Sequence, residues 1–378
     1  MANKKIKRIV KVKKHPKKKK HFVRRVVLML LFVALVYVAL VGYQIASSLM
    51  DSLNTVDRVN IGDTDDALMI NDGVSAAAAN SGVINIALFG LDARADETAS
   101  RSDTIIVLSV DTVNHDITLT SILRDTYIGI PDEYYSKINA AYFIGGPELA
   151  VQTLNTNFDL DIHDYITVDF SAIADIVDAV GGVEITVSED EVDALNGLIF
   201  DSNRLLGGTL SPYISAGTQV LDGKQALAYC RIRKLGNGDF DRTARQREVI
   251  EQILDAVKTN FSPDLITRMA SAVSDDISTS MSNKELFHLA WEVFRARKTV
   301  QMDSLTDSTY LKSATIDGSM VLVTVTQEDA VKDLHSIIYG DTAYTPSAEV
   351  EALSKKLKKI TNQINYYTID TDPSIAVD

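Results

Sequence analysis

The sequence predicts an α/β fold, a mixed central sheet flanked by helices, preceded by a single N-terminal apolar segment that would cross a membrane. From residue 83 onwards, short apolar runs typical of buried strands alternate with longer stretches of helical period. Such alternation is the pattern of a sheet covered by helices. The length of 378 residues allows one large domain with appendages, because single cores usually stop growing at about 250 to 300 residues.

The N-terminal segment is strongly basic. Residues 1–50 hold 13 of the 38 lysines and arginines and no acidic residue, so the rest of the chain carries 25 basic against 51 acidic residues. A polybasic arm alone would suggest nucleic acid as a partner, but residues 26–43 are almost continuously apolar. As a helix they extend about 27 Å, close to the roughly 30 Å thickness of the hydrocarbon core. The sequence therefore predicts a basic tail over residues 1–25, a transmembrane helix over residues 26–46, and no nucleic-acid partner.

The charge asymmetry also predicts the orientation of the chain. Lysines and arginines before the span place the N-terminus in the cytoplasm and the acidic body outside, in a single-pass protein of the cell membrane whose basic tail contacts membrane lipid. Cleavage after the small residues 46–48 is the alternative, but the apolar run exceeds the roughly 7 to 15 residues of a signal-peptide core, which favours an uncleaved signal-anchor. The single cysteine, Cys230, excludes an internal disulfide, as in many bacterial envelope proteins.

The elements after the span follow in order. Residues 47–82 are polar and rich in Ala, Asp and Ser, which predicts an extracytoplasmic linker. Strands are predicted at residues 83–90, 103–111, 115–123, 164–170, 183–188 and 319–326. Helices are predicted at residues 147–157, 171–182, 221–233, 241–260, 282–297 and 328–340. Pro147 suits a first helical turn, Ser171 is the expected N-cap of its helix, Gly181 the expected end, and Ser282 with Glu285 has capping-box spacing.

Two stretches lack a regular pattern. Residues 189–217 are expected to be irregular, and residues 341–378 to form a loosely attached C-terminal tail. The folded domain is therefore predicted to span residues 83–340.

A cluster of basic residues near position 240 stands out in this acidic chain. Arg242, Arg245 and Gln246 share one face of a predicted helix and lie in its first turns, where the helix dipole disfavours cations unless an anion is bound. Arg231 and Arg233 alternate as they would on an extended stretch. Guanidinium pairs match phosphate oxygens, so the pattern indicates binding of two phosphates, with surface solubility as the alternative.

Acidic residues occupy the loop between the first two predicted strands. Asp92 and Asp103 flank this loop, and Arg101 lies within it. Two acids in this position suit a magnesium ion, which prefers oxygen ligands and usually keeps substrate phosphates in its shell. Capping of the loop is the alternative. Arg124 ends the third strand, at a sheet edge where ligands gather.

Six motifs between residues 83 and 257 resemble, in the same order, those of the LytR-CpsA-Psr (LCP) family of bacterial envelope phosphotransferases. They are LDAR…RSDTI, SILRDT, KINAAYFIGG, DAVGGVEI, LDGKQALAYCRIR and GDFDRTARQREVI. Members of the family transfer a polyprenyl-pyrophosphate-linked glycopolymer, such as a teichoic acid or capsular polysaccharide, onto the C6 hydroxyl of N-acetylmuramic acid in peptidoglycan and release polyprenyl phosphate. The resemblance implies an LCP-like fold, this transferase activity, Mg²⁺ as cofactor, the lipid-linked polymer as donor and peptidoglycan as acceptor.

The motif positions imply roles for individual residues. Asp92 and Asp103 would be the magnesium-associated acids. The pyrophosphate would be held by Arg101, Arg124, Arg231, Arg233 and Arg242, with Asp239 and Gln246 beside them. Further candidates for this binding are Lys137, Asn139 and Arg245. The candidate catalytic residues are Asp92, Asp103, Arg101 and Asp239, and Asp103 and Asp239 are alternative general bases for the acceptor hydroxyl.

Two other functions fit the same residues. A non-catalytic binder or regulator would hold polyprenyl phosphates without turnover, and a polyprenyl-pyrophosphate hydrolase would use water as the acceptor. The presence of both Asp92 and Asp103 favours an enzyme over a binder.

Overall fold

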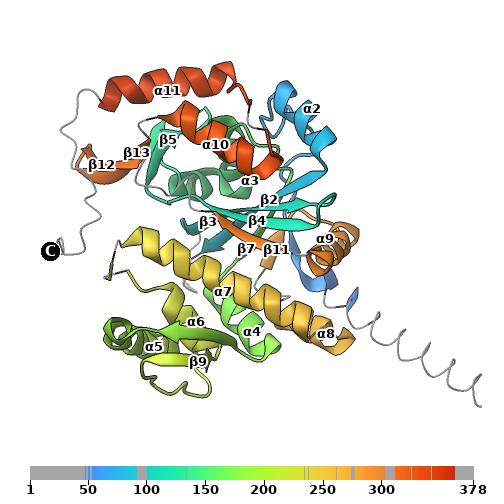
Figure 1. Cartoon of the computed structure of the whole chain (residues 1–378), viewed down its shortest axis with the longest axis vertical. Helices are drawn as coiled ribbons and strands as arrows, with labels where there is room; N and C mark the ends of the chain where they lie inside the picture. The colour runs from blue at the N-terminus through green and yellow to red at the C-terminus, as the bar shows by residue number, and fades with distance from the viewer. Residues whose placement is uncertain are drawn as a thin grey trace, which may run out of the picture. The chain divides into compact units, whose positions relative to one another are not determined.

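Figure 1 shows the computed structural model of the chain. It describes residue 47 and residues 50–361 apart from 52, 92–99, 133, 234, 237, 261, 274–276, 297, 303–310, 325 and 342. The chain divides into two compact units, residues 1–48 and 49–378, and the described residues fall almost entirely in the second. The predicted basic tail and transmembrane helix lie outside them. Within the described residues, no helix combines the length and apolar character needed to cross a membrane.

A mixed sheet of seven strands forms the centre of the fold among the described residues. Its strand order is β1-β10-β7-β2-β3-β4-β11. The central strand β2 pairs in parallel with β7 and antiparallel with β3, and β3 pairs antiparallel with β4. The strands are β1 (Asp57–Arg58), β2 (Val83–Leu91), β3 (Ser102–Asp111), β4 (Asp116–Ser121), β7 (Asp164–Val168), β10 (Ile277–Thr279) and β11 (Lys298–Met302). The sequence prediction of a mixed sheet is confirmed.

Helices cover both faces of this sheet, because successive side chains of a strand point to opposite faces. Phe89 of β2 packs in one core with α3 (Asn139–Phe158) and α10 (Gln327–Tyr339), and α2 (Asp72–Ser81) contacts the same strand. Ile86, three residues earlier, packs in a second core with α7 (Asp239–Thr259) and α9 (Asn283–Arg295). Figure 1 shows these two helical layers on either side of the sheet.

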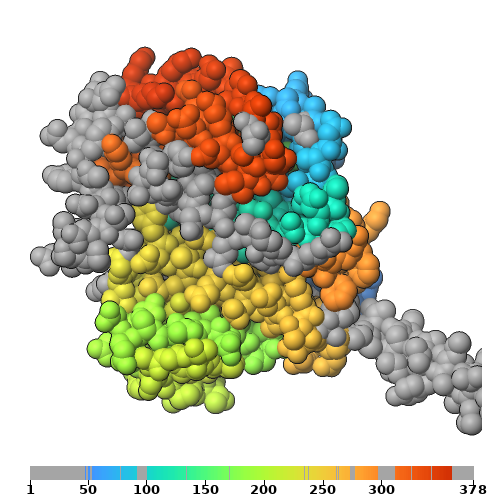
Figure 2. Space-filling view, viewed as in Figure 1, coloured from blue at the N-terminus to red at the C-terminus, as the bar shows by residue number. Residues whose placement is uncertain are grey.

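Residues 170–230 form a separate helical lobe with its own hydrophobic core. Its elements are α4 (Phe170–Val180), β8 (Val183–Val187), η1 (Glu189–Glu191), α5 (Val192–Leu206), β9 (Gly217–Leu221) and α6 (Gly223–Cys230). Helix α7 lies between this lobe and the sheet. Ile250 and Leu254 contact the sheet core, whereas Val249 and Ile253 contact the lobe core. The short helix α8 (Pro263–Val273) packs against α4, and Figure 2 shows α7 and α8 above the lobe.

A four-stranded sheet completes the fold, in the order β12-β13-β5-β6. Its strands are β5 (Thr126–Gly129), β6 (Tyr135–Lys137), β12 (Leu311–Ile316) and β13 (Ser319–Thr324). Helix α11 (Ala348–Thr361) covers it, with Leu353 and Leu357 buried against Val321 and Val323. The pairing of β13 with β5 joins residues nearly 200 positions apart in the sequence.

Most predicted element ends agree with the structure. Helix α3 breaks at Gly145 and Gly146, which have non-helical angles, and resumes at Pro147 as the sequence predicted. Gly181 ends α4 with φ 95°, in the left-handed region that glycine adopts most readily. The predicted N-cap Ser171 is wrong. Asp169 caps α4 by accepting from the Ala172 N–H, and the Ser171 hydroxyl donates to the same carboxylate at 2.8 Å.

Three predicted irregular stretches are in fact part of the folded unit. Within the predicted linker, Ile61, Leu68 and Ile70 are buried in the sheet core beside helix α2, so order begins before residue 83. Residues 192–206 form helix α5 instead of an irregular segment. Residues 348–361 form helix α11 instead of part of a loose tail, and Leu357 is fully buried there.

We expect Leu357→Ala to destabilise the full-length protein by about 2 to 5 kcal/mol, because truncation of a fully buried leucine removes apolar burial and leaves a cavity. Urea unfolding in detergent micelles measures this. Lys359→Ala, an exposed position on the same helix, serves as the control and should change the unfolding free energy by less than about 0.5 kcal/mol. Equal stability of the two variants would show that α11 is not packed on the domain.

Candidate active site

The candidate site forms where three distant segments meet beside the start of β3. Strand β3 runs antiparallel to β4, so Asp103 near its beginning lies close to Arg124, just after the end of β4. The apolar residues of α7 pack on the same sheet and bring the first turn of that helix to this edge. Asp239 and Arg242 belong to this turn, and Arg233 precedes it. We call Asp103, Arg124, Arg233, Asp239 and Arg242 the ionic cluster.

Alternating charges connect the ionic cluster. Asp103 accepts from two arginines: its Oδ1 lies 2.7 Å from Arg124 Nη1, and its Oδ2 lies 2.9 Å from Arg233 Nη2. Asp239 also accepts from two, because its Oδ2 lies 3.3 Å from Arg124 Nε and 3.2 Å from Arg242 Nη2. Arg242 Nη2 also donates to the main-chain oxygen of Asp103 at 3.3 Å. Three cations thus share two carboxylates.

Arg242 is the most constrained member of the cluster. Its side chain is 2% exposed, and its Nε and Nη1 have no hydrogen-bond partner within the part of the chain that the structure describes. Burial lowers the pKa of Arg242 to about 10; Asp239 and Asp103 oppose this shift, whereas the positive charges of Arg124 and Arg233 add to it. A buried guanidinium with unused donors is costly, so the arrangement favours an anion at this position.

Asp103 and Arg124, which form the shortest ion pair of the cluster, both stay ionised. Burial alone would raise the pKa of Asp103, but the charges of Arg124, Arg233 and Arg242 outweigh it and bring that pKa below its ordinary value. Burial alone would lower the pKa of Arg124, but the nearby carboxylates, Asp103 foremost, raise it. Asp103 and Arg124 therefore keep their charges at neutral pH.

Several predicted site residues lie around the cluster. Lys137 Nζ lies 2.8 Å from Asp125 Oδ1, and Asn139 donates its main-chain N–H to the Arg124 carbonyl at 3.2 Å. The guanidinium of Arg101 lies 5.8 Å from the ring centre of Phe143.

Two further predicted residues lie at the end of α6 and on α7. Arg231 is half-buried where α6 ends. Gln246 is half-buried on α7, and its side-chain oxygen has no hydrogen-bond partner among the described residues. Asp92 lies outside the described residues, so its predicted role stays a prediction.

Arg245 points away from the ionic cluster although it shares a helix with Arg242. Its Nε lies 2.9 Å from Glu191 Oε1, its Nη1 donates to the Ile232 carbonyl at 3.4 Å, and its guanidinium lies over the Tyr229 ring. Burial alone would raise the pKa of Glu191, but hydrogen bonds from Ser188 and from Arg245 lower it. The contacts fasten α7 to the beginning of α5.

Sequence reasoning did not single out two residues that support the site. Asp125 lies between two of the cations, with its Oδ1 on Lys137 and its Oδ2 at 3.8 Å from Arg124 Nε. Its position directly after Arg124 in the motif SILRDT was the available signal. Arg247 is buried and donates from Nη1 to the Ser121 hydroxyl at 2.7 Å, which ties α7 to the end of β4.

Of the two predicted magnesium ligands, Asp103 lies in the part of the chain that the structure describes. In the ranges that the structure describes, no group of three or more His, Cys, Asp or Glu side chains is arranged to hold a metal ion. Asp103 nevertheless fits as one ligand. Each of its oxygens accepts one arginine, and a carboxylate oxygen has a second lone pair.

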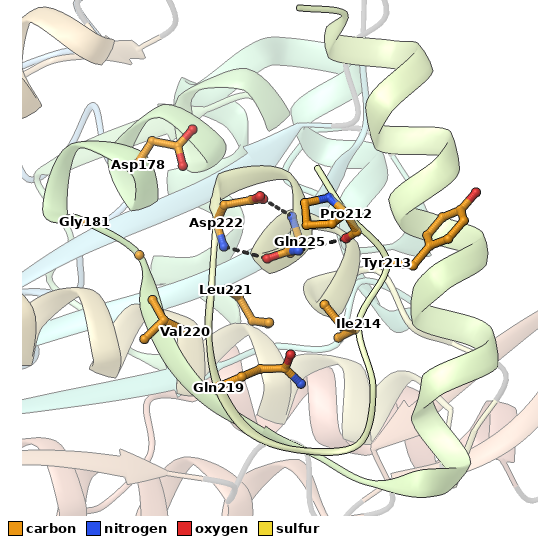
Figure 3. Close-up of a pocket in the computed structure, with 11 residues that line it drawn as sticks. Asp178, Gly181, Pro212, Tyr213, Ile214, Gln219, Val220, Leu221, Asp222 and Gln225 are labelled. Atoms are coloured by element: carbon orange, nitrogen blue, oxygen red, sulfur yellow. Dashed lines mark hydrogen bonds between the residues drawn. The ribbon is translucent and has the colours of Figure 1, made fainter. Parts of the chain in front are cut away.

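A hollow of about 400 Å³ lies in the helical lobe, apart from the ionic cluster. Figure 3 shows Gln225 hydrogen-bonded to Asp222 and Pro212 inside it. Asp178 and Asp222 are the two acids that line this hollow, and Asp178 accepts from the Gly223 N–H at 2.7 Å. Both acids therefore cap backbone groups, and no member of the ionic cluster lines this hollow.

Comparisons with known proteins agree on one family and one fold. The model of the LytR_cpsA_psr family matches residues 36–335. The polyisoprenyl-teichoic acid–peptidoglycan teichoic acid transferase TagU of Oceanobacillus iheyensis is 34% identical over 224 residues, which cover 57% of this chain and 65% of that protein, just under two thirds of its length. TagU of Enterococcus faecalis is 32% identical over 241 residues, which cover 62% of this chain and 73% of that protein.

A solved structure of Bacillus subtilis YwtF (TagT) with bound octaprenyl pyrophosphate lipid has the same fold. Its TM-score is 0.51 at 23% sequence identity, and the match covers 69% of this chain and 92% of that one.

We expect Arg124→Gln to destabilise the protein by about 1 to 3 kcal/mol near neutral pH and by much less in acid. The folded-state pKa of Asp103 lies below the ordinary 3.8. Its ion pairs therefore stabilise the fold fully above that value and are lost as the pH falls through the lowered pKa. Urea unfolding at about pH 6 and about pH 3 measures the difference. Arg268→Gln, which removes an exposed pair with Asp264, is the control. A penalty for Arg124→Gln that stays constant with pH would contradict this account.

Proposed function

The chain belongs to the LytR_cpsA_psr family, and from this premise we propose that it is a glycopolymer–peptidoglycan phosphotransferase. It takes a glycopolymer linked to polyprenyl pyrophosphate, transfers the polymer phosphate to peptidoglycan and releases polyprenyl phosphate. The observation that carries the proposal is the buried guanidinium of Arg242, which has unused donors and adjoins two carboxylates and two further arginines. The teichoic acid transferases among its relatives support it.

The ionic cluster suits the pyrophosphate of the donor. Arg242 offers two guanidinium nitrogens, Nε and Nη1, without a partner in the described chain, and Arg233 is 43% exposed on its side chain and so accessible to a ligand. Arginine forks bind phosphate oxygens in pairs. Negative charge grows on the leaving phosphate during phosphoryl transfer, and cations fixed in place before the reaction stabilise it without reorganisation.

The transfer step requires a base for the acceptor hydroxyl. The hydroxyl oxygen forms a bond to the phosphorus that carries the polymer, and the bond from that phosphorus to the bridging oxygen breaks. Polyprenyl phosphate leaves with the electron pair, and the hydroxyl proton passes to a carboxylate. We assign this carboxylate to Asp239. Among the described residues, its Oδ2 forms ion pairs with Arg124 and Arg242, and its Oδ1 forms none. Both oxygens of Asp103 bind arginines, whose charges lower its pKa, so neither oxygen is free of a cation when a proton must be accepted.

Magnesium completes the proposal. Asp103 would hold the ion together with Asp92, and the ion would supply further neutralisation of the pyrophosphate charge. Asp103 would then have a double task, since it also orients Arg124 and Arg233.

The proposed location follows the sequence prediction. Residues 26–46 would anchor the chain in the cell membrane with the N-terminus in the cytoplasm and the catalytic domain outside. Both substrates, a polyprenyl-linked polymer and peptidoglycan, belong to that side of the membrane.

We expect Arg242→Met to lower kcat/KM for the donor by roughly 100-fold or more, the usual effect of removing one preorganised charge donor. Full-length protein in detergent, a synthetic lipid-linked sugar and an acceptor glycan provide the assay. Arg204→Met, an exposed arginine of α5, is the control and should retain full activity. Release of polyprenyl phosphate without acceptor would identify a hydrolase, and donor binding with no turnover would identify a binder.

We expect Asp239→Asn to lower kcat roughly 100-fold, within the range for loss of a general base, and to abolish the acidic limb of the pH–rate profile. Asp241→Asn changes an acid in the same helical turn and should keep both the rate and the limb. If Asp239→Asn retains the acidic limb whereas Asp103→Asn loses it, Asp103 is the base.

A further inference from the structure

Helix α9 carries an exposed aromatic face that the proposed reaction does not use. Phe287 and Trp291, one helical turn apart, are 40% and 55% exposed. Lys284 precedes Phe287 by three residues and Arg295 follows Trp291 by four, so both share this face of the helix. We call these four residues the aromatic face of α9. Leu286, Leu289 and Val293 of the same helix pack in the core beside the sheet.

The described contacts leave the aromatic face open to solvent. The Trp291 ring lies 6.0 Å from that of Phe294 on the same helix. Arg295 is 40% exposed on its side chain; it pairs with Glu292 of α9 at 3.1 Å, and its Nη2 lies 2.8 Å from His115 Nε2. Figure 2 shows the orange surface of α9 at the edge of the molecule. A tryptophan and a phenylalanine exposed together between basic residues mark a contact surface.

The contacts between α9 and the first residues of the folded unit indicate what binds the aromatic face. Asn283, the first residue of α9, donates to Asn54 Oδ1 at 3.0 Å and lies 3.2 Å from the Met50 sulfur. Arg58 binds the side chain of Asn283 and the Leu53 carbonyl. Figure 1 shows this blue segment beside α9. The predicted transmembrane helix ends at residue 46, and four residues reach at most about 14 Å.

We propose that the aromatic face of α9 docks on the outer surface of the membrane, with Trp291 and Phe287 at the level of the lipid headgroups. This inference rests on the proposed membrane anchor. Tryptophan is enriched at membrane interfaces because it combines an apolar body with a polar N–H. Lys284 and Arg295 bind anionic lipid phosphates while their stems lie along the apolar surface.

The charge of the whole domain supports this orientation. Outside residues 1–50 the chain carries 25 basic and 51 acidic residues, so an anionic membrane repels most of its surface. A face that combines basic and aromatic residues next to the anchor is the one that such a membrane attracts. Docking there holds the domain in one orientation above the lipid donor.

The single tryptophan of the chain provides a direct test. Full-length protein is reconstituted into vesicles of phosphatidylcholine and phosphatidylglycerol, with or without bromine on the acyl chains. Because Trp291 lies in the interface, we expect brominated lipid to quench about half of its emission. As a matched control, Trp291→Phe combined with Tyr213→Trp moves the only tryptophan to an exposed aromatic position of the helical lobe, where emission should not change.

Two further variants separate docking from incidental proximity. Phe287→Glu should remove most of the quenching of Trp291, whereas Leu210→Glu, at a 73% exposed position of the lobe, should leave it unchanged. Equal Trp291 emission in the two vesicle types overturns the inference, as does equal quenching at Trp291 and at the lobe position. Failure of the chain to float with vesicles overturns both anchor and inference. Loss of transferase activity with quenching intact counts against the proposed function alone.

Discussion

The candidate site depends on the incomplete neutralisation of a buried arginine. Removing a guanidinium from water is tolerable only where carboxylates and hydrogen-bond acceptors replace the solvent. Arg242 forms an ion pair with Asp239 and donates a hydrogen bond to the main-chain oxygen of Asp103. Both acids also form ion pairs with other arginines. The packed domain thus holds more positive than negative charge at one point. This imbalance makes the cluster suited to a phosphate-bearing ligand, whereas a fully paired network would serve stability alone.

Helix α7 makes that arrangement possible because it belongs to two hydrophobic cores at once. Ile250 and Leu254 fix it to the sheet, and Val249 and Ile253 fix it to the helical lobe. Its three arginines accordingly point in three directions: Arg242 to the ionic cluster, Arg245 to Glu191, and Arg247 to Ser121. Only the first contributes charge to the cluster. The other two set the position from which it does so.

The sequence predicted the elements with a clear apolar period and missed those without one. Strands β2 and β3 contain apolar runs and β4 alternates apolar with polar residues. The arginines and their motifs were also identified from the sequence. Ile61 and Leu68 were missed because single apolar residues in a polar stretch carry no period, although the core buries both.

Helix α5 was missed because Asn196 and Gly197 interrupt its pattern. The sequence could not predict that Arg245 points away from the ionic cluster. Helical spacing shows that Arg242 and Arg245 share a face, but it does not identify the residues that each contacts. Glu191, its partner, lies 54 positions away in the sequence.

The pairing of β5 with β13 has a consequence for the synthesis of the chain. Leu322 donates its N–H to the Asp125 carbonyl at 2.9 Å, directly beside Arg124, and β11 closes the other sheet against β4. Both closures use residues near the C-terminal end. A chain that emerges vectorially from the ribosome or a translocation channel therefore exposes unpaired strand edges until almost all of it has appeared. The residues of the ionic cluster have all emerged by residue 242, but the backbone beside Arg124 gains its partner only when β13 follows.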